Sequence, residues 1–195
     1  MSMTGHQGPG DGSVWSTGSG KEFPNLWAFA ALKDDGSVVT WGSGGGDPSA
    51  AASALSGDVT EIFSTYHAFA ALKDDGSVIT WGSAERGGDS NSVAEDLEGG
   101  VKEISSTLRA FAALKDNGSV VTWGNGPAGG DSRAVANALS DDVTDVFSNM
   151  DAFAARKLDG SVVTWGHGER GGNSSSVADV LTEGVSEIFS TSWAF

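Results

Sequence analysis

The sequence AFAALKDDGSVVTWG, residues 28–42, occurs four times with few changes. It returns as AFAALKDDGSVITWG at 68–82, as AFAALKDNGSVVTWG at 110–124 and as AFAARKLDGSVVTWG at 152–166. With the Ala-Phe pair at 194–195, the copies begin at residues 28, 68, 110, 152 and 194, which gives spacings of 40, 42, 42 and 42. A fixed period of this length is typical of solenoids, propellers and other arrays of stacked supersecondary units.

Each copy predicts a β-hairpin. Six residues such as AFAALK lead to an Asp-Gly or Asn-Gly pair, and six more such as SVVTWG follow. We expect each pair to supply the positive φ angles of a tight hairpin turn. The second arm alternates, with Val39 and Trp41 on one face and Val38 and Thr40 on the other. The small alanines of the first arm leave room for a bulky neighbour to pack closely.

The rest of each unit predicts a Gly-rich corner, a short helix and a third strand. Valine and leucine lie four residues apart, as in Val93 and Leu97, which indicates one or two helical turns. The predicted helix N-caps are Asp47, Asp89, Asp131 and Asn173. The third strand is VTEIFST and its copies. With the period of two of a strand, one apolar residue of each copy is expected to point inward: Ile62, Ile104, Val146 and Ile188. Each unit is therefore expected to be a small three-stranded sheet with a short helix.

The period defines one predicted repeat domain, residues 1–195. Its expected units are a degenerate unit at 11–27, full units at 28–67, 68–109, 110–151 and 152–193, and the start of a further unit at 194–195. A unit of about 42 residues cannot bury both faces of its sheet alone, so its neighbours must stack beside it. The predicted fold class is all-β, a tandem-repeat array that resembles a β-propeller.

The pattern L-x-x-D-G-x-V-x-x-W-G carries a family resemblance. In the first unit its residues are Leu32, Asp35, Gly36, Val38, Trp41 and Gly42. With the Gly-rich corner, the Val/Leu segment and a V-x-x-I strand, it resembles the regulator of chromosome condensation repeat family over residues 28–195. The resemblance implies a propeller of four-stranded blades, usually seven, that serves as a binding platform. The units here are shorter and fewer, and the family's Gly-Gln-Leu-Gly corner is replaced by GGDP, GGDS or GGNS.

Charge and composition exclude several classes of function. Eleven Lys and Arg against 26 Asp and Glu give a net charge of −15, which repels phosphate backbones, so neither nucleic acid binding nor a chromatin role is expected. No apolar run approaches the roughly 20 residues of a spanning helix, so membrane insertion is not expected. The absence of cysteine excludes disulfides and thiolate metal sites and leaves the compartment undetermined.

Catalytic signatures are weak throughout, and we predict no catalytic, cofactor-binding or metal-binding residue. The histidines His6, His67 and His167 show no metal-ligand spacing. The corners at 124–129 and 166–171 match GxGxxG, but their segments are too short for a βαβ crossover and are interpreted as turns. Carboxylate pairs such as Asp34 and Asp35 are interpreted as a charged solvent face, with weak divalent-cation binding left open.

Two further sets of residues bear on function. The first set is the tryptophans that occupy the same position in each unit: Trp41, Trp81, Trp123 and Trp165. We interpret them as core residues packed between blades, and the alternative is an exposed aromatic platform for sugar rings. The second is the loops that vary between copies, which we expect to contact a partner: Tyr66, His67, Leu108, Arg109, Met150, Asp151, Glu85, Arg86, Glu169 and Arg170. The predicted function is a non-catalytic scaffold or protein-interaction module, with a carbohydrate-binding or adhesive segment of a large surface protein as the alternative.

The ends of the array allow two arrangements. In one, residues 193–195 pair with residues 12–17 and close a ring, as propellers often do with strands from both termini. In the other, the chain is a piece of a longer array, and open terminal strands allow self-association between molecules.

Overall fold

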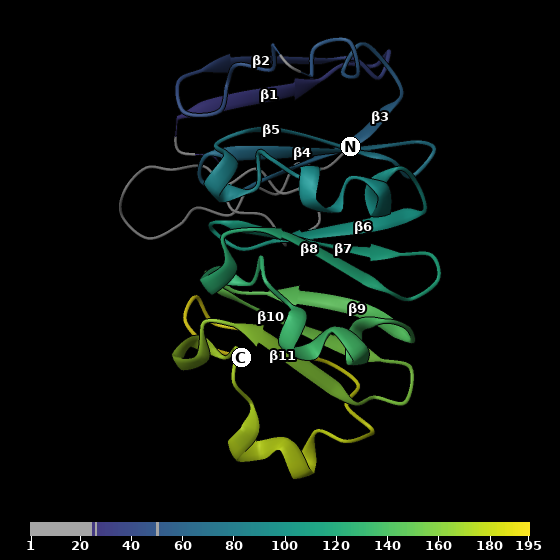
Figure 1. Ribbon diagram of the computed structural model, residues 1–195, viewed down its shortest axis with the longest axis vertical. Coiled ribbons are helices and arrows are strands. Elements are labelled where there is room, and N and C mark those ends of the chain that lie inside the picture. The colour runs from purple at the N-terminus through teal and green to yellow at the C-terminus, as the bar shows by residue number, and fades with distance from the viewer. Residues whose placement is uncertain (1–24, 26, 50) are drawn as a thin grey trace, which may run out of the picture.

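The computed structural model describes residues 25, 27–49 and 51–195, and within them the strands form four antiparallel sheets stacked one after another (Figure 1). The sheets are β1 (Ala28–Leu32) and β2 (Val38–Gly42); β3 (Val59–Ser64), β4 (Ala68–Lys73) and β5 (Val78–Gly82); β6 (Val101–Ser106), β7 (Ala110–Lys115) and β8 (Val120–Gly124); β9 (Val143–Ser148), β10 (Ala152–Lys157) and β11 (Val162–Gly166). The all-β tandem array predicted from the sequence is confirmed. The expected pairing at residues 12–17, and nearly all of the degenerate unit at 11–27, lie outside the described residues.

The repeated hairpins form as predicted, but their turns differ in detail. Lys33 N–H donates to Ser37 O and Gly36 N–H donates to Lys33 O, which closes a three-residue loop. Only the glycine takes a positive φ, 75° at Gly36, whereas Asp35 accepts hydrogen bonds from the N–H and hydroxyl of Ser37. The expectation that both residues of the pair supply positive φ is therefore wrong, because the aspartate stabilises the turn through its side chain instead.

The third strand does not belong to the hairpin that precedes it. The central strand β4 pairs with both β3 and β5, and no sheet joins β3 to β1 or β2. The expectation that each sequence unit forms its own three-stranded sheet is therefore wrong. Each sheet instead combines the third strand of one sequence unit with the hairpin of the next unit. Only residues 65–67 separate β3 from β4, and Thr65 Oγ1 accepts the Ala68 N–H across this short turn. Closing this short loop costs less chain entropy than pairing β3 back across the long connection from β2.

The core lies between successive sheets, in three interfaces. The first interface separates the β1–β2 sheet from the β3–β5 sheet, the second lies between the β3–β5 and β6–β8 sheets, and the third between the β6–β8 and β9–β11 sheets. Each is built in the same way: Phe153 and Trp165 of one sheet pack against Ala110 and Ala112 of the sheet before it. The alanines therefore make room for an aromatic pair, as the sequence predicted.

The tryptophans of the three later sheets are core residues packed between successive sheets. Trp81, Trp123 and Trp165 are 2–4 % exposed, and each stacks on the phenylalanine opposite it on the neighbouring strand with ring centroids 5.2 Å apart. Trp41 stacks on Phe29 in the same way but remains 51 % exposed on the outer face of the first sheet. The platform for sugar rings is therefore wrong for the three inner tryptophans.

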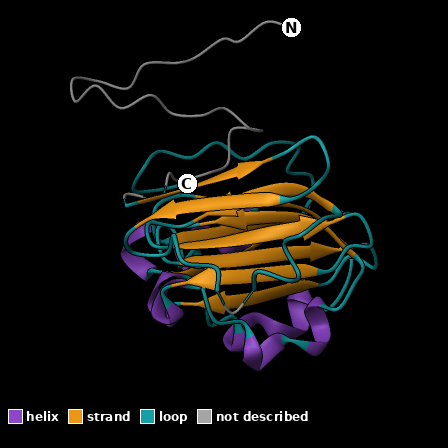
Figure 2. Ribbon diagram, turned by 90° about the horizontal axis from the view of Figure 1, so that it is seen from above, coloured by secondary structure: helices purple, strands orange, loops and turns teal. Residues whose placement is uncertain are grey.

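Short 3₁₀ helices lie at the rim of the stack (Figure 2). They are η1 (Ala84–Arg86), η2 (Asn91–Val93), η3 (Glu95–Leu97), η4 (Gly126–Ala128), η5 (Arg133–Leu139), η6 (Gly168–Arg170) and η7 (Ser175–Val180). Three of the predicted N-caps are displaced by one residue: the cap of η5, for example, is Ser132, and Asp131 accepts the Arg133 N–H from the position before it. The prediction for Asp47 is wrong, because no described helix follows it before β3. Leu97 and Leu139 anchor their segments in the core at 2 % exposure.

The last predicted strand, VSEIFST at 185–191, forms no strand, although Val185 N–H donates to Gly160 O at 3.0 Å. Its equivalents Ile104 and Val146 are buried as predicted, at 1 % exposure, whereas Ile62 and Ile188 are only half-buried. The segment 185–191 forms no strand because no described hairpin lies beside it to pair with it. No helix among the described residues is long and apolar enough to cross a membrane.

Candidate functional site

The turns that vary between units stand above one another at one edge of the stack. Tyr66 N–H donates to Leu108 O at 3.1 Å, and Leu108 N–H donates to Met150 O at 2.9 Å. The series continues with Met150 N–H and Ser192 O at 3.3 Å. Because these hydrogen bonds use only the backbone, they hold the turns in register and leave the side chains free to vary.

The corners of the units meet these turns. Thr65 Oγ1 donates to Arg86 O at 2.9 Å, Thr107 Oγ1 to Ala128 O at 3.0 Å, and Asn149 Nδ2 to Arg170 O at 2.7 Å. The two groups of candidate loops, separated by about twenty residues of sequence, therefore form one surface. We call it the variable edge; it comprises turns 65–67, 107–109, 149–151 and 191–193 with corners 84–86, 126–128 and 168–170.

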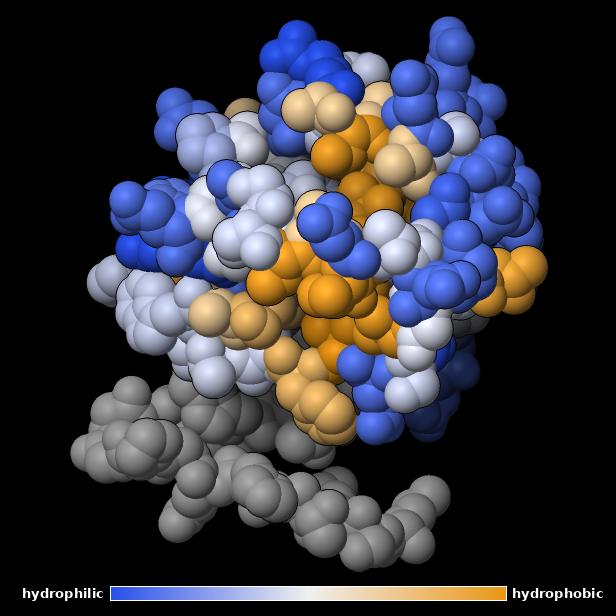
Figure 3. Space-filling model, turned by 90° about the horizontal axis from the view of Figure 1, so that it is seen from below, coloured by the Kyte–Doolittle hydropathy of each residue, from blue (hydrophilic) through white to orange (hydrophobic). Residues whose placement is uncertain are grey.

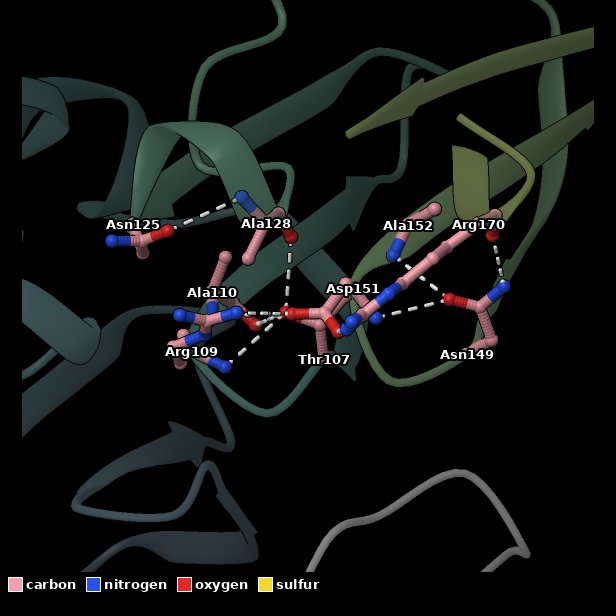
Figure 4. A network of polar contacts seen from close by, with 9 residues as sticks. All are labelled: Thr107, Arg109, Ala110, Asn125, Ala128, Asn149, Asp151, Ala152 and Arg170. Carbon is pink, nitrogen blue, oxygen red and sulfur yellow. Dashed lines mark hydrogen bonds and ion pairs between the residues drawn. The ribbon is translucent and has the colours of Figure 1, made fainter. Parts of the chain in front are cut away.

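A buried carboxylate joins two arginines at the variable edge (Figure 4). Asp151 is fully buried, and its Oδ1 accepts a hydrogen bond from Arg109 Nη2 at 2.6 Å while its Oδ2 pairs with Arg170 Nη1. The side chains of Arg109 and Arg170 are 40 % and 34 % exposed. Asp151 is therefore out of reach of a partner and instead fixes the positions of two guanidinium groups that face solvent.

Asn149 holds the backbone around this carboxylate. Its Oδ1 accepts the N–H groups of Asp151 and Ala152 at 3.0 and 2.9 Å. Sequence reasoning did not single out Asn149 or its counterpart Thr107, although both directly precede the variable pair. The signal was present, because a Thr or Asn recurs at this position as Thr65, Thr107, Asn149 and Thr191.

Aromatic and apolar side chains complete the edge. The Arg170 guanidinium lies 4.5 Å from the ring centroid of Trp193, which is 56 % exposed, and this geometry is a cation–π contact. Tyr66, Leu108 and Met150 are half-buried. Burial, followed by the positive charge of Arg86, lowers the pKa of His67, so this imidazole is neutral at pH 7. Glu85 and Glu169 are exposed on the corners.

The sequence raised two further candidates, a divalent-cation site and a GxGxxG corner. Among the described residues no group of three His, Asp or Glu side chains is close enough to hold a metal ion. The corner at 124–129 contains η4, and its glycines Gly124 and Gly129 take φ values of 98° and 99°. A side chain on Gly129 would collide with the Phe153 ring, so this glycine allows close packing between sheets. The interpretation of this GxGxxG match as a turn is thereby supported.

Comparisons with known proteins agree on the fold and no more. Prp20p from Saccharomyces cerevisiae, solved in a study of its binding to Gsp1p and histones, aligns over 74 % of this chain and 43 % of its own with a TM-score of 0.51 and 17 % identity. Yeast RCC1 (Prp20) bound to Kap60 gives a TM-score of 0.50 at 17 % identity, over 73 % of this chain and 42 % of that one. The CRINKLY WD40 ectodomain of the Arabidopsis thaliana receptor kinase ACR4 aligns with a TM-score of 0.47 and 17 % identity, over 78 % and 53 % of the two chains.

No protein-family profile matches the chain, and no curated protein sequence matches it either. The chain has the fold of propeller-type repeat proteins. It spans less than half the length of the two yeast structures that it resembles.

Proposed function

We propose that this protein is a non-catalytic repeat module that binds a protein partner through the variable edge. The observation that carries the proposal is that turns and corners which differ between units meet at one edge of a constant frame. Strands and interfaces repeat almost unchanged, and backbone hydrogen bonds hold these variable turns in register. The segments 90–100 and 132–142 also differ between units, but they lie outside this edge. A frame that holds variable side chains in register is suited to recognition. Proteins of the same fold bind protein partners, as the two yeast structures record.

The chemistry of the edge suits contact with a protein surface. Arginine, tyrosine, tryptophan and methionine are the residue types enriched in the cores of protein interfaces. Arg86, Arg109 and Arg170 are balanced on this edge by Glu85, Asp151 and Glu169, so the edge is neutral in a protein whose net charge is −15. Asp151 is buried, whereas the arginines and both glutamates reach solvent. The edge therefore offers charges of both signs for ion pairs with a partner.

The carbohydrate-binding alternative has less support. Its aromatic platform required a repeated, exposed tryptophan register, and three of the four members are buried between sheets. The exposed tryptophans Trp27 and Trp193 hold the same position of the repeat, but the units between them carry His67, Arg109 and Asp151 there, so no exposed tryptophan series runs along the described part of the stack.

The test is capture of cross-linked partners with matched variants. Tyr66→Ser with Arg86→Ser removes one apolar and one cationic side chain from the variable edge and leaves the buried Asp151 pairs intact. Lys102→Ser with Leu158→Ser removes the same two types from exposed positions elsewhere. We expect recovery of the partners to fall at least about tenfold with the first double variant, a loss of roughly 1.4 kcal/mol, and to be unchanged with the second. Equal recovery with both double variants would overturn the proposal.

A further inference from the structure

The first sheet exposes an aromatic pair that every later sheet buries. Phe29, Val39 and Trp41 share the outer face of β1 and β2 and are 64 %, 50 % and 51 % exposed. The equivalent pairs in the other sheets are at most 4 % exposed, because each fits against the sheet before it. We call this outer surface, with residues 29, 39 and 41, the knob face.

The opposite end of the stack has the recess that such a pair fills. A recess of about 470 Å³ lies against β10 and is lined by Ala154, Gly171, Leu181, Val185, Ile188 and Phe195, among others. Figure 3, which views the molecule from this end, shows a continuous apolar patch surrounded by hydrophilic residues. We call this surface the socket face, defined by the six residues just named.

The socket face is the start of a fourth interface of the same kind. In the third interface Phe153 packs on Gly129, and Trp165 Nε1–H donates to Gly129 O at 3.0 Å. At the socket face the ring of Phe195 lies against Gly171 in the same manner, but no described tryptophan reaches the Gly171 carbonyl. One half of the aromatic pair is thus in place and the other half is missing.

The segments that would be exchanged are alike in sequence and in local structure. Residues 25–29 read NLWAF and residues 191–195 read TSWAF. Asn25 Oδ1 accepts the N–H groups of Trp27 and Ala28, both at 3.0 Å. Thr191 Oγ1 accepts those of Trp193 and Ala194 at 3.4 and 3.1 Å. Residues 27–29 can therefore occupy the place of residues 193–195 with the same backbone geometry.

We infer that a second copy of this chain docks head to tail on the socket face, with its hairpin 27–42 taking the place of residues 193–195. The segment 185–190 then becomes the third strand of a completed fifth sheet. Phe29 of the incoming copy replaces Phe195 against Gly171, and Trp41 fills the position beside it that is empty in the single chain. The contact continues the three interfaces inside each chain, so its complementarity is already built. It unites two different surfaces, which makes it a heterologous contact.

Two physical properties distinguish this docking. First, blades of a propeller turn about an axis, and this chain spans 43 % of the length of the yeast propeller, so two copies joined at both ends are expected to close a ring. Second, each chain carries a net charge of −15, so repulsion opposes association and salt strengthens it.

The test is the mass in solution, measured by sedimentation over a range of protein and salt concentrations. Wild type is expected to reach twice the 19.8 kDa of one chain, at lower protein concentration when salt is high. Trp41→Glu on the knob face and Ile188→Glu on the socket face are each expected to stay at the mass of one chain. Leu158→Glu, at a hairpin turn where the side chain is 77 % exposed, is the control and keeps the wild-type mass. Circular dichroism and the melting temperature verify that each variant is folded.

Mixing the two defective variants separates head-to-tail docking from other modes. Trp41→Glu retains the socket face and Ile188→Glu retains the knob face, so a mixture is expected to form a pair that neither forms alone. Deleting residues 194–195 is expected to lower the concentration needed for pairing, because it removes the segment that the incoming hairpin displaces. A single-chain mass for wild type under all conditions, or a mixture that stays unpaired, overturns the inference. Neither result bears on binding through Tyr66 and Arg86.

Discussion

The corner after β2 and the corner after β8 serve the same role but bond their neighbours differently. After β8, Gly129 O accepts Trp165 Nε1–H and Ala128 O accepts the Thr107 hydroxyl, both at 3.0 Å. After β2, Trp81 Nε1 and Asn25 Nδ2 are buried in the equivalent places without a hydrogen-bond partner among the described residues. The side chains are thus positioned alike, and only one of the two corners satisfies them.

The difference comes from two residues of length. The corner after β2 runs from 43 to 47 and the corner after β8 from 125 to 131, and only the longer one contains a 3₁₀ helix. That helix turns the carbonyls of Ala128 and Gly129 toward the neighbouring side chains. Burial of a repeated tryptophan therefore requires only a preceding sheet to pack against, whereas satisfaction of its N–H depends on the corner of that preceding sheet.

The largest expected effect tests burial itself. Trp165→Ala should destabilise the protein by about 3–5 kcal/mol, because it empties a packed interface. Trp41→Ala on the exposed outer face should cost less than about 1 kcal/mol in the single chain. Urea denaturation followed by circular dichroism measures both, and equal losses would contradict the assignment of the inner tryptophans as core residues.

The corner after β11 differs in a second way, because its Arg170 neutralises a buried carboxylate. Arg109→Met with Arg170→Met should cost about 3 kcal/mol, since it leaves Asp151 charged and unpaired in the interior. Adding Asp151→Asn should restore most of the loss, because the unpaired charge is then gone. Denaturation midpoints of the double and triple variants make the comparison, and a triple variant no more stable than the double would refute this role of the ion pairs.

Replacing the short corner after β2 by a seven-residue corner tests whether corner length and sequence satisfy the buried donors. Replacing Ser43–Asp47 by the seven residues SAERGGD of 83–89 should supply carbonyls to Trp81 and Asn25. The expected gain is about 1–2 kcal/mol, since two buried donors become satisfied. Slower hydrogen exchange of the Trp81 indole N–H is the direct readout. Inserting two glycines at the same place is the control, and an equal gain from it would show that length alone matters.

The smallest expected effect concerns the hairpin turns. Hydrogen bonds from the hydroxyl and N–H of Ser37 lower the pKa of Asp35 from 3.8 to about 2. Because the pKa is depressed in the folded state, the stabilisation is present above pH 3.8 and is lost as pH falls toward 2. In the turn at Asn117 an amide oxygen accepts the equivalent hydrogen bonds from Ser119, so these bonds should not respond to pH. An NMR titration in which Ser37→Ala fails to raise the pKa of Asp35 would contradict this cause.

Part of the candidate site could be predicted from the sequence. Variation at one position of a constant repeat identified the loops with Tyr66, Arg109 and Arg170, because a periodic fold brings equivalent positions together. That Asp151 is buried between two arginines could not be predicted, since the two arginines are 61 residues apart in sequence and their meeting depends on how a turn and a corner pack.

The sequence alone determined the period, the hairpins, the alternating faces and the stacking of like units, because each follows from local turn chemistry and from the spacing of apolar residues. Only the tertiary structure decided which hairpin each third strand joins, which polar groups are satisfied, and which faces of the stack remain open. These depend on contacts between residues far apart in sequence, where a corner two residues shorter is enough to change the outcome. The segment 185–190 also depends on such distant contacts, because its strand-like sequence forms no strand without a neighbouring hairpin.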